Sequence, residues 1–332
     1  MSSFGLVLAW ALVAVGGGFA LLYAVPELQL VNRRVAMIAA FIPVGIVAWS
    51  LALVLFLAAG RGWEKLAALV AVAGLALQLS WISGYVPART LVPGPVGTSL
   101  FTLNARCDSK DREDLVRVLG ERGPGVVVIV GAPERLRGYL DESGVLDGHP
   151  YRRFFPMGHL PSCGTAVYAR VPVGEVADSP VPAVRLAVEG GPVVLVPADV
   201  PGPQDGVSAW EQEIAALGET AAGQVAAGWP VVVAGDFNAV REHLPFRRLV
   251  DGGLVRGGLA GGESAGAGLV NAAEAAGGGW MPTYRADRPP WPPVIEIDHV
   301  LVSGGVEVGS IETVRVGGHA HLALLAWVRV GQ

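Results

Sequence analysis

The sequence predicts an α/β (α+β) protein in two parts. Three transmembrane helices are followed by a domain of mixed or antiparallel sheets flanked by helices. Residues 1–90 hold only seven charged side chains, whereas the whole chain of 332 residues holds 24 basic and 29 acidic ones. From residue 98 onward, short apolar runs alternate with helical patterns, and most connections between them are too short for parallel crossovers.

Three apolar stretches separate the few charges of the amino-terminal part. They lie at Phe4–Val25, Val35–Ala59 and Leu66–Tyr85, and each is close to the ~20 residues needed to cross a bilayer. A buried core hairpin of a soluble protein is a weaker alternative, because three such lengths in succession are rare in soluble cores. A cleaved signal peptide is disfavoured, since no basic segment precedes the first stretch and two more follow. We therefore predict a three-helix transmembrane region over residues 1–85.

The rest of the chain is predicted to be a linker, residues 86–97, and an acidic domain, residues 98–332. The linker holds three prolines and two glycines. Five of the basic and two of the acidic residues lie in 1–90, which leaves a net charge of −8 for the remainder. A protein that tracks duplex DNA presents a basic face, because neutralisation of phosphates supplies most of that affinity. Duplex DNA is therefore an unfavourable partner, whereas the membrane bilayer is an expected one.

Apolar runs and helical periodicity predict the order of elements in this domain. The first four are strand Ser99–Asn104, helix Asp111–Glu121, strand Val126–Val130 and helix Pro133–Leu140. Later strands are expected at Gly164–Ala169, Val184–Val188, Val193–Val196, Val231–Ala234, Ile295–Val302, Ile311–Val316 and Leu322–Val330, with helices at Val207–Ala227 and Leu244–Val250. The Gly-rich stretch Gly252–Gly268 has no periodicity, so we predict a surface loop there.

Polar side chains end several of these apolar runs. Asp236 and Asn238 follow one buried strand, and a carboxylate and an amide two residues apart can hold a water or a metal-bound phosphate oxygen. Asp298 lies inside a hydrophobic strand, where an ionised carboxylate is costly unless it is paired; a histidine such as His321 is a suitable partner. Asn104 ends another strand. The alternative is an ordinary turn after Gly235 and an ordinary histidine at a strand start.

These residues, in this order, resemble the endonuclease/exonuclease/phosphatase superfamily, which has the DNase I-like fold. The resemblance covers about residues 98–330 and rests on Gly235–Asn238, Ile297–Val300 and His321, with support from Asn104, Gly164–Arg170 and Trp280–Tyr284. It implies a four-layer α/β/β/α sandwich of two mixed sheets. It also implies that a water attacks a phosphoester with the assistance of a bound metal. In that reaction Asp236 would orient the water, and Asn238 and Asn104 would contact phosphate or metal. His321 would pair with Asp298 and stabilise the phosphoryl charge.

The chain departs from the family pattern at its metal ligands. Gly131 stands where the family has a metal-binding glutamate, and Ala320 stands where it has an aspartate. The implied cofactor is Mg²⁺ or Mn²⁺, with Glu134 as a substitute ligand; the alternative for Glu134 is a solvent-facing residue of its helix. Arg106 and Asp199 occupy positions of other family site residues and are predicted to contact the substrate. For Arg106, an ordinary surface arginine is the alternative.

The two cysteines, Cys107 and Cys163, fit either one disulfide in an oxidising compartment or two free thiols. In the fold of the superfamily that the chain resembles, these two positions lie toward the same rim of the sheets. The resemblance therefore implies a Cys107–Cys163 disulfide near the mouth of the site. The resemblance to membrane-attached bacterial members implies a domain held outside the cell, and two cysteines suit that compartment, so we expect a multi-pass membrane protein with an extracytoplasmic domain. Loop charges alone slightly favour the opposite orientation.

Two functions are compatible with this pattern. The first is a membrane-anchored phosphoesterase that hydrolyses a small or lipid-linked phosphodiester. The second is a catalytically impaired family member that binds a phosphate ligand or a partner. Gly131 and Ala320 are the residues that separate the two.

Overall fold

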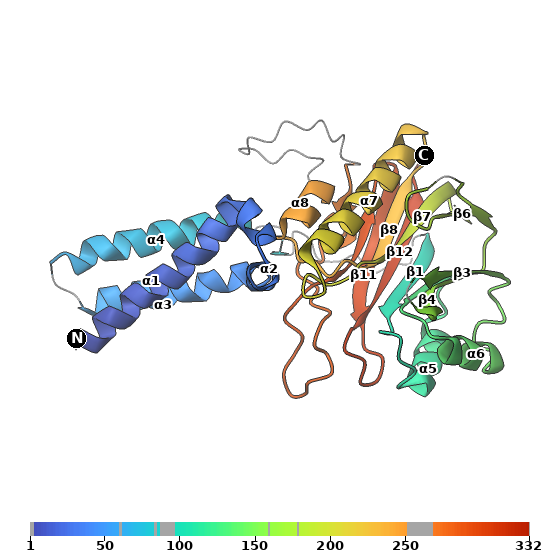
Figure 1. Ribbon diagram of the computed structural model, residues 1–332, viewed down its shortest axis with the longest axis horizontal. Coiled ribbons are helices and arrows are strands. Elements are labelled where there is room, and N and C mark those ends of the chain that lie inside the picture. Colours follow the sequence, from blue (N-terminus) through green and yellow to red (C-terminus); the bar gives the residue numbers. More distant parts are fainter. Residues whose placement is uncertain are drawn as a thin grey trace.

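The computed structural model describes residues 3–59, 62–82, 85–86, 97–158, 160–177, 179–250 and 268–331. Nearly all of the predicted linker and of the Gly-rich stretch after residue 251 lie outside these ranges. Figure 1 shows an elongated bundle of helices that projects from one side of a domain of strands and helices.

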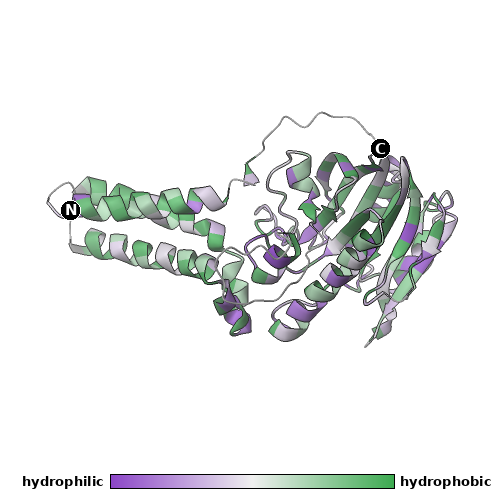
Figure 2. Ribbon diagram, turned by 90° about the horizontal axis from the view of Figure 1, so that it is seen from above, coloured by the Kyte–Doolittle hydropathy of each residue, from purple (hydrophilic) through white to green (hydrophobic). Residues whose placement is uncertain are grey.

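The amino-terminal bundle contains three main helices: α1 (Ser3–Ala24), α3 (Gly45–Ala59) and α4 (Glu64–Trp81). Two of them, α1 and α4, are long and apolar enough to cross a membrane. A third span results if α2 (Arg33–Ala39) is counted together with Ile42–Ala58, although the two segments are bent by 53°. Figure 2 shows that apolar residues predominate along the helices of the bundle, as expected of helices that face lipid.

The middle predicted span is therefore not one continuous helix. After the 3₁₀ helix η1 (Pro26–Leu30) and α2, a second 3₁₀ helix, η2 (Ile42–Val44), separates α2 from α3. Pro43 lies within η2 and has no backbone N–H to continue the helical ladder. The carbonyl of Ile42 accepts hydrogen bonds from the backbone N–H of Gly45 and from the buried Gln78 side chain on α4.

Twelve strands of the described residues form two six-stranded mixed sheets. The first sheet has the order β11 (Val306–Val314), β12 (Ala323–Val330), β1 (Thr98–Asn104), β2 (Val126–Val130), β4 (Leu160–Ala169), β3 (Tyr151–Met157). The second has the order β5 (Val173–Glu175), β6 (Val184–Val188), β7 (Gly191–Asp199), β8 (Val231–Asp236), β10 (Asp298–Val302), β9 (Val270–Asn271). Each sheet contains one parallel pair near its centre, β1 with β2 and β7 with β8.

Alternation along the strands divides their side chains between an inner and an outer layer. Between the sheets, Val128 of β2, Leu195 of β7 and Val232 of β8 belong to one buried cluster. The outer face of the first sheet packs against helices α5 (Arg112–Arg122) and α6 (Glu134–Glu142). The outer face of the second packs against α7 (Val207–Ala226) and α8 (Leu244–Val250). The predicted four-layer α/β/β/α sandwich is confirmed.

Every strand and helix predicted for the domain is present, with shifts of a few residues at the ends. Strands β3 and β5 and the short helix α9 (Ala272–Ala275) with β9 were not predicted. β3 is an edge strand whose residues are all exposed or partly exposed, so its sequence lacks the alternation that marks a half-buried strand.

Candidate functional site

Asp236 ends the central strand β8 and is only 2% exposed. Its Oδ1 accepts the backbone N–H of Asn238 at 2.7 Å, and its Oδ2 accepts Asn104 Nδ2 at 2.6 Å and Asn238 Nδ2 at 3.2 Å. Gly235 has φ +144°, and a Cβ there would collide with the carbonyl of Ala198 on β7, so the strand passes its neighbour closely. Asn238 has φ +46°, which asparagine tolerates better than most residues.

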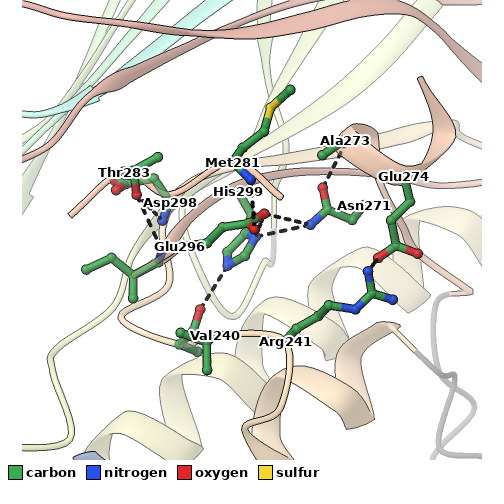
Figure 3. Close-up of polar contacts among 12 residues, drawn as sticks. Val240, Arg241, Asn271, Ala273, Glu274, Met281, Thr283, Glu296, Asp298 and His299 are labelled. Carbon is green, nitrogen blue, oxygen red and sulfur yellow. Dashed lines mark hydrogen bonds and ion pairs between the residues drawn. The ribbon is translucent and has the colours of Figure 1, made fainter. Parts of the chain in front are cut away.

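His321 and Asp298 form a hydrogen-bonded pair beside this carboxylate. His321 Nδ1 lies 2.8 Å from Asp298 Oδ2, and its Nε2 lies 4.0 Å from Asp236 Oδ2. Both members of the pair are buried. The backbone N–H of Asp298 donates to Thr283 Oγ1 at 3.3 Å (Figure 3), which positions the start of β10. Antiparallel pairing of β10 with β8 places Asp298 directly opposite Asp236.

The protonation equilibria of this cluster are linked. Burial raises the pKa of Asp236, and the neighbouring Asp298 carboxylate raises it further. Burial alone would lower the pKa of His321, but the carboxylates of Asp298 and Asp236 outweigh it, so the net shift is upward. Both shifts favour the protonated form of the group, so Nε2 of His321 is a potential hydrogen-bond donor.

A cavity of about 730 Å³ opens at this end of the sheets. Six of the predicted site residues line it: Asn104, Arg106, Asp199, Asp236, Asn238 and His321. Asp298 lies behind His321 and reaches the cavity through that side chain. One wall is apolar, formed by Phe155, Met157 and Leu160 of the β3–β4 hairpin.

The turn after Asn104 forms the rim of the cavity. Arg106 and Cys107 both have positive φ, 55° and 54°. The N–H of Arg106 donates to Asn104 Oδ1 at 2.7 Å, and the N–H of Cys107 donates to the carbonyl of Gly131 at 2.7 Å. A disulfide links Cys107 to Cys163 of β4, so the predicted pairing is confirmed. Hydrogen bonds and the disulfide together hold this turn against the end of β2.

Gly131 lies directly under this turn. It has φ +59°, and a Cβ at this position would lie 3.0 Å from the backbone nitrogens of Arg106 and Cys107 and 3.1 Å from Asn104 Oδ1. Real Cβ contacts are rarely this close. The resemblance implies a metal-binding glutamate at this position, and here any side chain on residue 131 would press on the backbone of the Arg106 turn.

Glu134 does not join the site. It is exposed in the first turn of α6 and does not line the cavity, so the predicted role as a substitute metal ligand is not supported by its position. The helix begins only after Ala132 and Pro133, which carry Glu134 to the outer layer. Ala320 is 8% exposed and offers no ligand atom.

Asp236, Asp298 and His321 form a buried group whose possible ligand atoms lie within 4.8 Å of one another, and such a group could hold a metal ion. The hydrogen bonds fit Mg²⁺ or Mn²⁺ poorly. These cations prefer oxygen ligands with free lone pairs. The Asp236 carboxylate already accepts three N–H donors, and Asp298 Oδ2 is engaged by His321. The group could therefore hold a metal ion, but it offers Mg²⁺ or Mn²⁺ fewer free oxygen ligands than an all-carboxylate set would.

Two further residues belong to the site but were not predicted individually. Tyr284 lines the cavity, and its ring centroid lies 4.9 Å from that of His321. Thr165 also lines it and donates its hydroxyl to Asp199 Oδ2 at 3.1 Å. Both lie in segments that resemble the family, Trp280–Tyr284 and Gly164–Arg170. The sequence therefore indicates these two segments, but it does not indicate which side chain in each of them lines the cavity.

A second buried polar group supports the site from behind (Figure 3). His299 follows Asp298, and its Nε2 lies 2.8 Å from the carbonyl of Ala239. On its other side, His299 Nδ1 lies 3.2 Å from Asn271 Nδ2 and 3.5 Å from Glu296 Oε1. These contacts join β10 to the loop that follows Asn238, so they fix that loop relative to the sheet.

Comparisons with known proteins agree with this geometry. The model of the Endonuclease/Exonuclease/phosphatase family matches residues 101–327, and the chain belongs to this family. At the level of the family, this match supports a phosphoesterase-like or nuclease-like hydrolase. No curated protein matches the chain at a significant level.

Solved structures share the fold at low sequence identity. Truncated TDP2 of Caenorhabditis elegans has a TM-score of 0.52 and 14% identity, and the match covers 69% of this chain and 96% of that one. An endonuclease/exonuclease/phosphatase from Beutenbergia cavernae has a TM-score of 0.50 and 20% identity, over 71% and 72% of the two chains. A functionally unknown conserved protein from Enterococcus faecalis has a TM-score of 0.52 and 13% identity, over 70% and 99%.

Proposed function

We propose that this protein is a membrane-anchored member of the family whose cavity binds a phosphodiester, small or lipid-linked, and whose hydrolytic step is impaired. The observation that carries the proposal is the closure of the metal-ligand position: the turn of Arg106 and Cys107 occupies the space beside Gly131. Recognition of phosphate depends on donors such as Arg106 and His321, which line the cavity. Metal-assisted cleavage depends on carboxylate ligands at the positions that Gly131 and Ala320 occupy in this chain.

The remaining donors suit a singly charged phosphate. Arg106 supplies a guanidinium at the rim, and the raised pKa of His321 favours a protonated ring at neutral pH. Guanidinium and imidazolium groups both donate charge-assisted hydrogen bonds to phosphate oxygens. A phosphodiester, with one negative charge per phosphate, matches this small number of donors.

Carboxylates on the other walls restrict the ligand further. Asp199, Asp205 and Glu213 line the same cavity. Their charges oppose a polyanion such as duplex DNA, since such binding depends on neutralising many phosphates with basic residues. The apolar β3–β4 wall and the adjacent bundle favour a ligand with an apolar portion, such as a phosphodiester carried by a lipid.

Equilibrium dialysis of the full-length protein in detergent, with bis(4-nitrophenyl) phosphate as probe and EDTA present, tests this proposal. We expect saturable binding that is lost in His321→Ala and weakened in Arg106→Ala, because both donors face the cavity. Arg135→Ala, a change in an exposed residue of α6, is the control and should bind normally. Absence of saturable binding in the parent would refute the proposal.

Hydrolysis is the second candidate function, and the intact His321–Asp298–Asp236 arrangement favours it. When His321 is neutral, a water held between the ring and a bound phosphate could lose its proton to Nε2 as its oxygen attacks phosphorus, with Asp298 stabilising the imidazolium. The bond to the departing alkoxide would break, and the imidazolium would return the proton to that alkoxide. Turnover of a phosphodiester that disappears in Asp236→Ala would support this candidate over simple binding.

A further inference from the structure

The loop between α9 and β10 exposes large apolar side chains. We call residues 280–294 the interfacial loop. Trp291 is 75% exposed, Val294 is 53% exposed and Trp280 is 47% exposed. Exposed apolar residues gathered on one loop mark an interaction surface more often than singly scattered ones do.

The interfacial loop is in direct contact with the end of the last membrane helix. The backbone N–H of Trp280 donates to the carbonyl of Tyr85 at 3.2 Å. The rings of Tyr85 and Trp280 meet edge to face, with centroids 6.3 Å apart. Tyr85 lies four residues after the end of α4, and the next residue, Val86, is 60% exposed. The loop is therefore tied to the segment that follows the last helix of the bundle.

We infer that the interfacial loop inserts Trp291 into the headgroup region of the same bilayer that the helices cross. This inference rests on the membrane anchoring of the proposed function. Tryptophan is enriched at membrane–water interfaces, because its ring is apolar while its N–H needs a polar partner. Arg288, three residues earlier, is exposed and can meet the phosphates of lipid headgroups.

The backbone of this loop is also suited to a poorly hydrated environment. Unsatisfied backbone N–H groups are costly near the membrane interior. Prolines have no N–H, and four of the five residues from 289 to 293 are proline: Pro289, Pro290, Pro292 and Pro293. The fifth, Trp291, donates its own N–H to the carbonyl of Arg288 at 3.0 Å. The tip of the loop therefore presents few unpaired donors.

The same loop forms part of the cavity. Tyr284 lies within it, lines the cavity and packs against the His321 ring. If Trp291 lies in the headgroup region, one wall of the cavity is held at the bilayer surface. A phosphodiester that belongs to a lipid could then reach His321 without leaving its leaflet.

Site-directed spin labelling in lipid nanodiscs tests the inference. The chain has two cysteines, and both are in the disulfide, so one introduced cysteine is the only free thiol. Labels are placed at Trp291→Cys, at Val70→Cys on α4 as the lipid reference, and at Val225→Cys. Val225, on α7, is an exposed apolar residue, 38% exposed, and is the control outside the loop. Collisions with oxygen report lipid, and collisions with a water-soluble nickel chelate report water.

We expect the oxygen-to-nickel collision ratio at residue 291 to be severalfold higher than at residue 225 and to approach that at residue 70. A ratio at 291 equal to that at 225, with 70 in lipid, would overturn the inference and leave the anchoring intact. A ratio at 70 equal to that at 225 would refute the anchoring and the inference together. The labelled protein is also moved from nanodiscs to a soluble polymer belt without lipid. If the difference in collision ratio between residues 291 and 225 is then lost, the result supports a lipid contact.

Discussion

At the scale of single residues, the site is defined by how the hydrogen-bonding capacity of Asp236 is used. Three N–H donors surround its carboxylate, and His321 approaches it from a fourth direction. A buried carboxylate is stable only when such partners compensate for lost hydration. The same partners leave little capacity for a hard cation, so they stabilise the fold of the site while restricting its chemistry.

Gly131→Ala tests the closure of the metal-ligand position. We expect it to lower the free energy of unfolding by about 1–2 kcal/mol, because an alanine at φ +59° is strained and its Cβ presses on the Arg106 turn. Thermal unfolding of the full-length protein in detergent measures the effect. Gly138→Ala, in α6 with open space around its Cβ, is the matched control and should be neutral or stabilising. Equal midpoints for Gly131→Ala and the parent would contradict the packing described.

Glu242 predicts a pH-dependent stability. Burial raises the pKa of Glu242 from 4.5 to about 7, although Tyr85 donates a hydrogen bond to its carboxylate. The folded protein therefore binds more protons than the unfolded chain between these values, so stability falls as pH rises from 4.5 to about 7. The loss is on the order of 3 kcal/mol. Glu242→Gln should remove the part of this dependence that Glu242 contributes and leave the part that comes from Asp236.

Denaturant unfolding at pH 5 and pH 8 measures the effect of Glu242. Glu219→Gln, a change in an exposed glutamate of α7, is the control and should keep the slope of the parent. Identical pH profiles for Glu242→Gln and the parent would mean that another group dominates.

At the scale of elements, strand ends place the site residues, and a covalent link fixes the turn beside them. β1 and β2 run parallel, as do β7 and β8, so Asn104, Asp199 and Asp236 emerge at corresponding strand ends. The Cys107–Cys163 disulfide then ties the turn after β1 to β4, across 56 residues of chain. The two strands that flank β2 are thereby held together at the rim of the cavity.

Replacement of both cysteines by serine is expected to destabilise the domain. Closure of a loop this long restricts the unfolded chain, and the chain-entropy model gives about 4 kcal/mol for its loss. Denaturant unfolding of the double variant, compared with the parent under non-reducing conditions, measures it. The Arg106 rim should also loosen, which would appear as faster amide hydrogen exchange at residues 105–107. A variant as stable and as protected as the parent would contradict this role.

Much of this element pattern could be predicted from the sequence, because buried strands and amphipathic helices have clear periodicities. The polar ends at Asn104, Asp236 and Asp298 could also be predicted, since each follows an apolar run. Tyr284 could not, because it comes from a long loop whose path depends on tertiary contacts with Ile295 and His321. The break between α2 and α3 was missed because the apolar stretch continues through it without a charge.

At the scale of the whole molecule, the bundle and the domain share buried contacts. Leu30 and Ala36, from the segment between α1 and α3, pack with the cluster that includes Trp210 and Phe246. His243 accepts the N–H of Val240 at Nδ1, 2.9 Å away, and its Nε2 lies 2.9 Å from the carbonyl of Ala36. This connection joins the bundle to the chain segment that follows Asn238.

Gln29→Ala tests how strongly the two parts are joined. Gln29 Oε1 accepts the N–H of Leu244 at 2.8 Å, and its Nε2 donates to the carbonyls of Leu22 and Glu242. Leaving these buried groups unpaired costs about 1–3 kcal/mol. We expect faster amide hydrogen exchange at residues 242–248, with no change in the first sheet. Gln212→Ala, at an exposed position of α7, is the control. Unchanged exchange in Gln29→Ala would show that the contact contributes little.

The central claim is that the cavity recognises a phosphodiester but lacks the metal site for efficient cleavage. Its most direct test is release of 4-nitrophenolate from bis(4-nitrophenyl) phosphate by the full-length protein, measured with Mg²⁺, with Mn²⁺ and with EDTA, beside Asp236→Ala. We predict no metal-dependent release above that of Asp236→Ala. Robust release by the parent that requires the metal and disappears in Asp236→Ala would contradict the account and establish the protein as an active hydrolase.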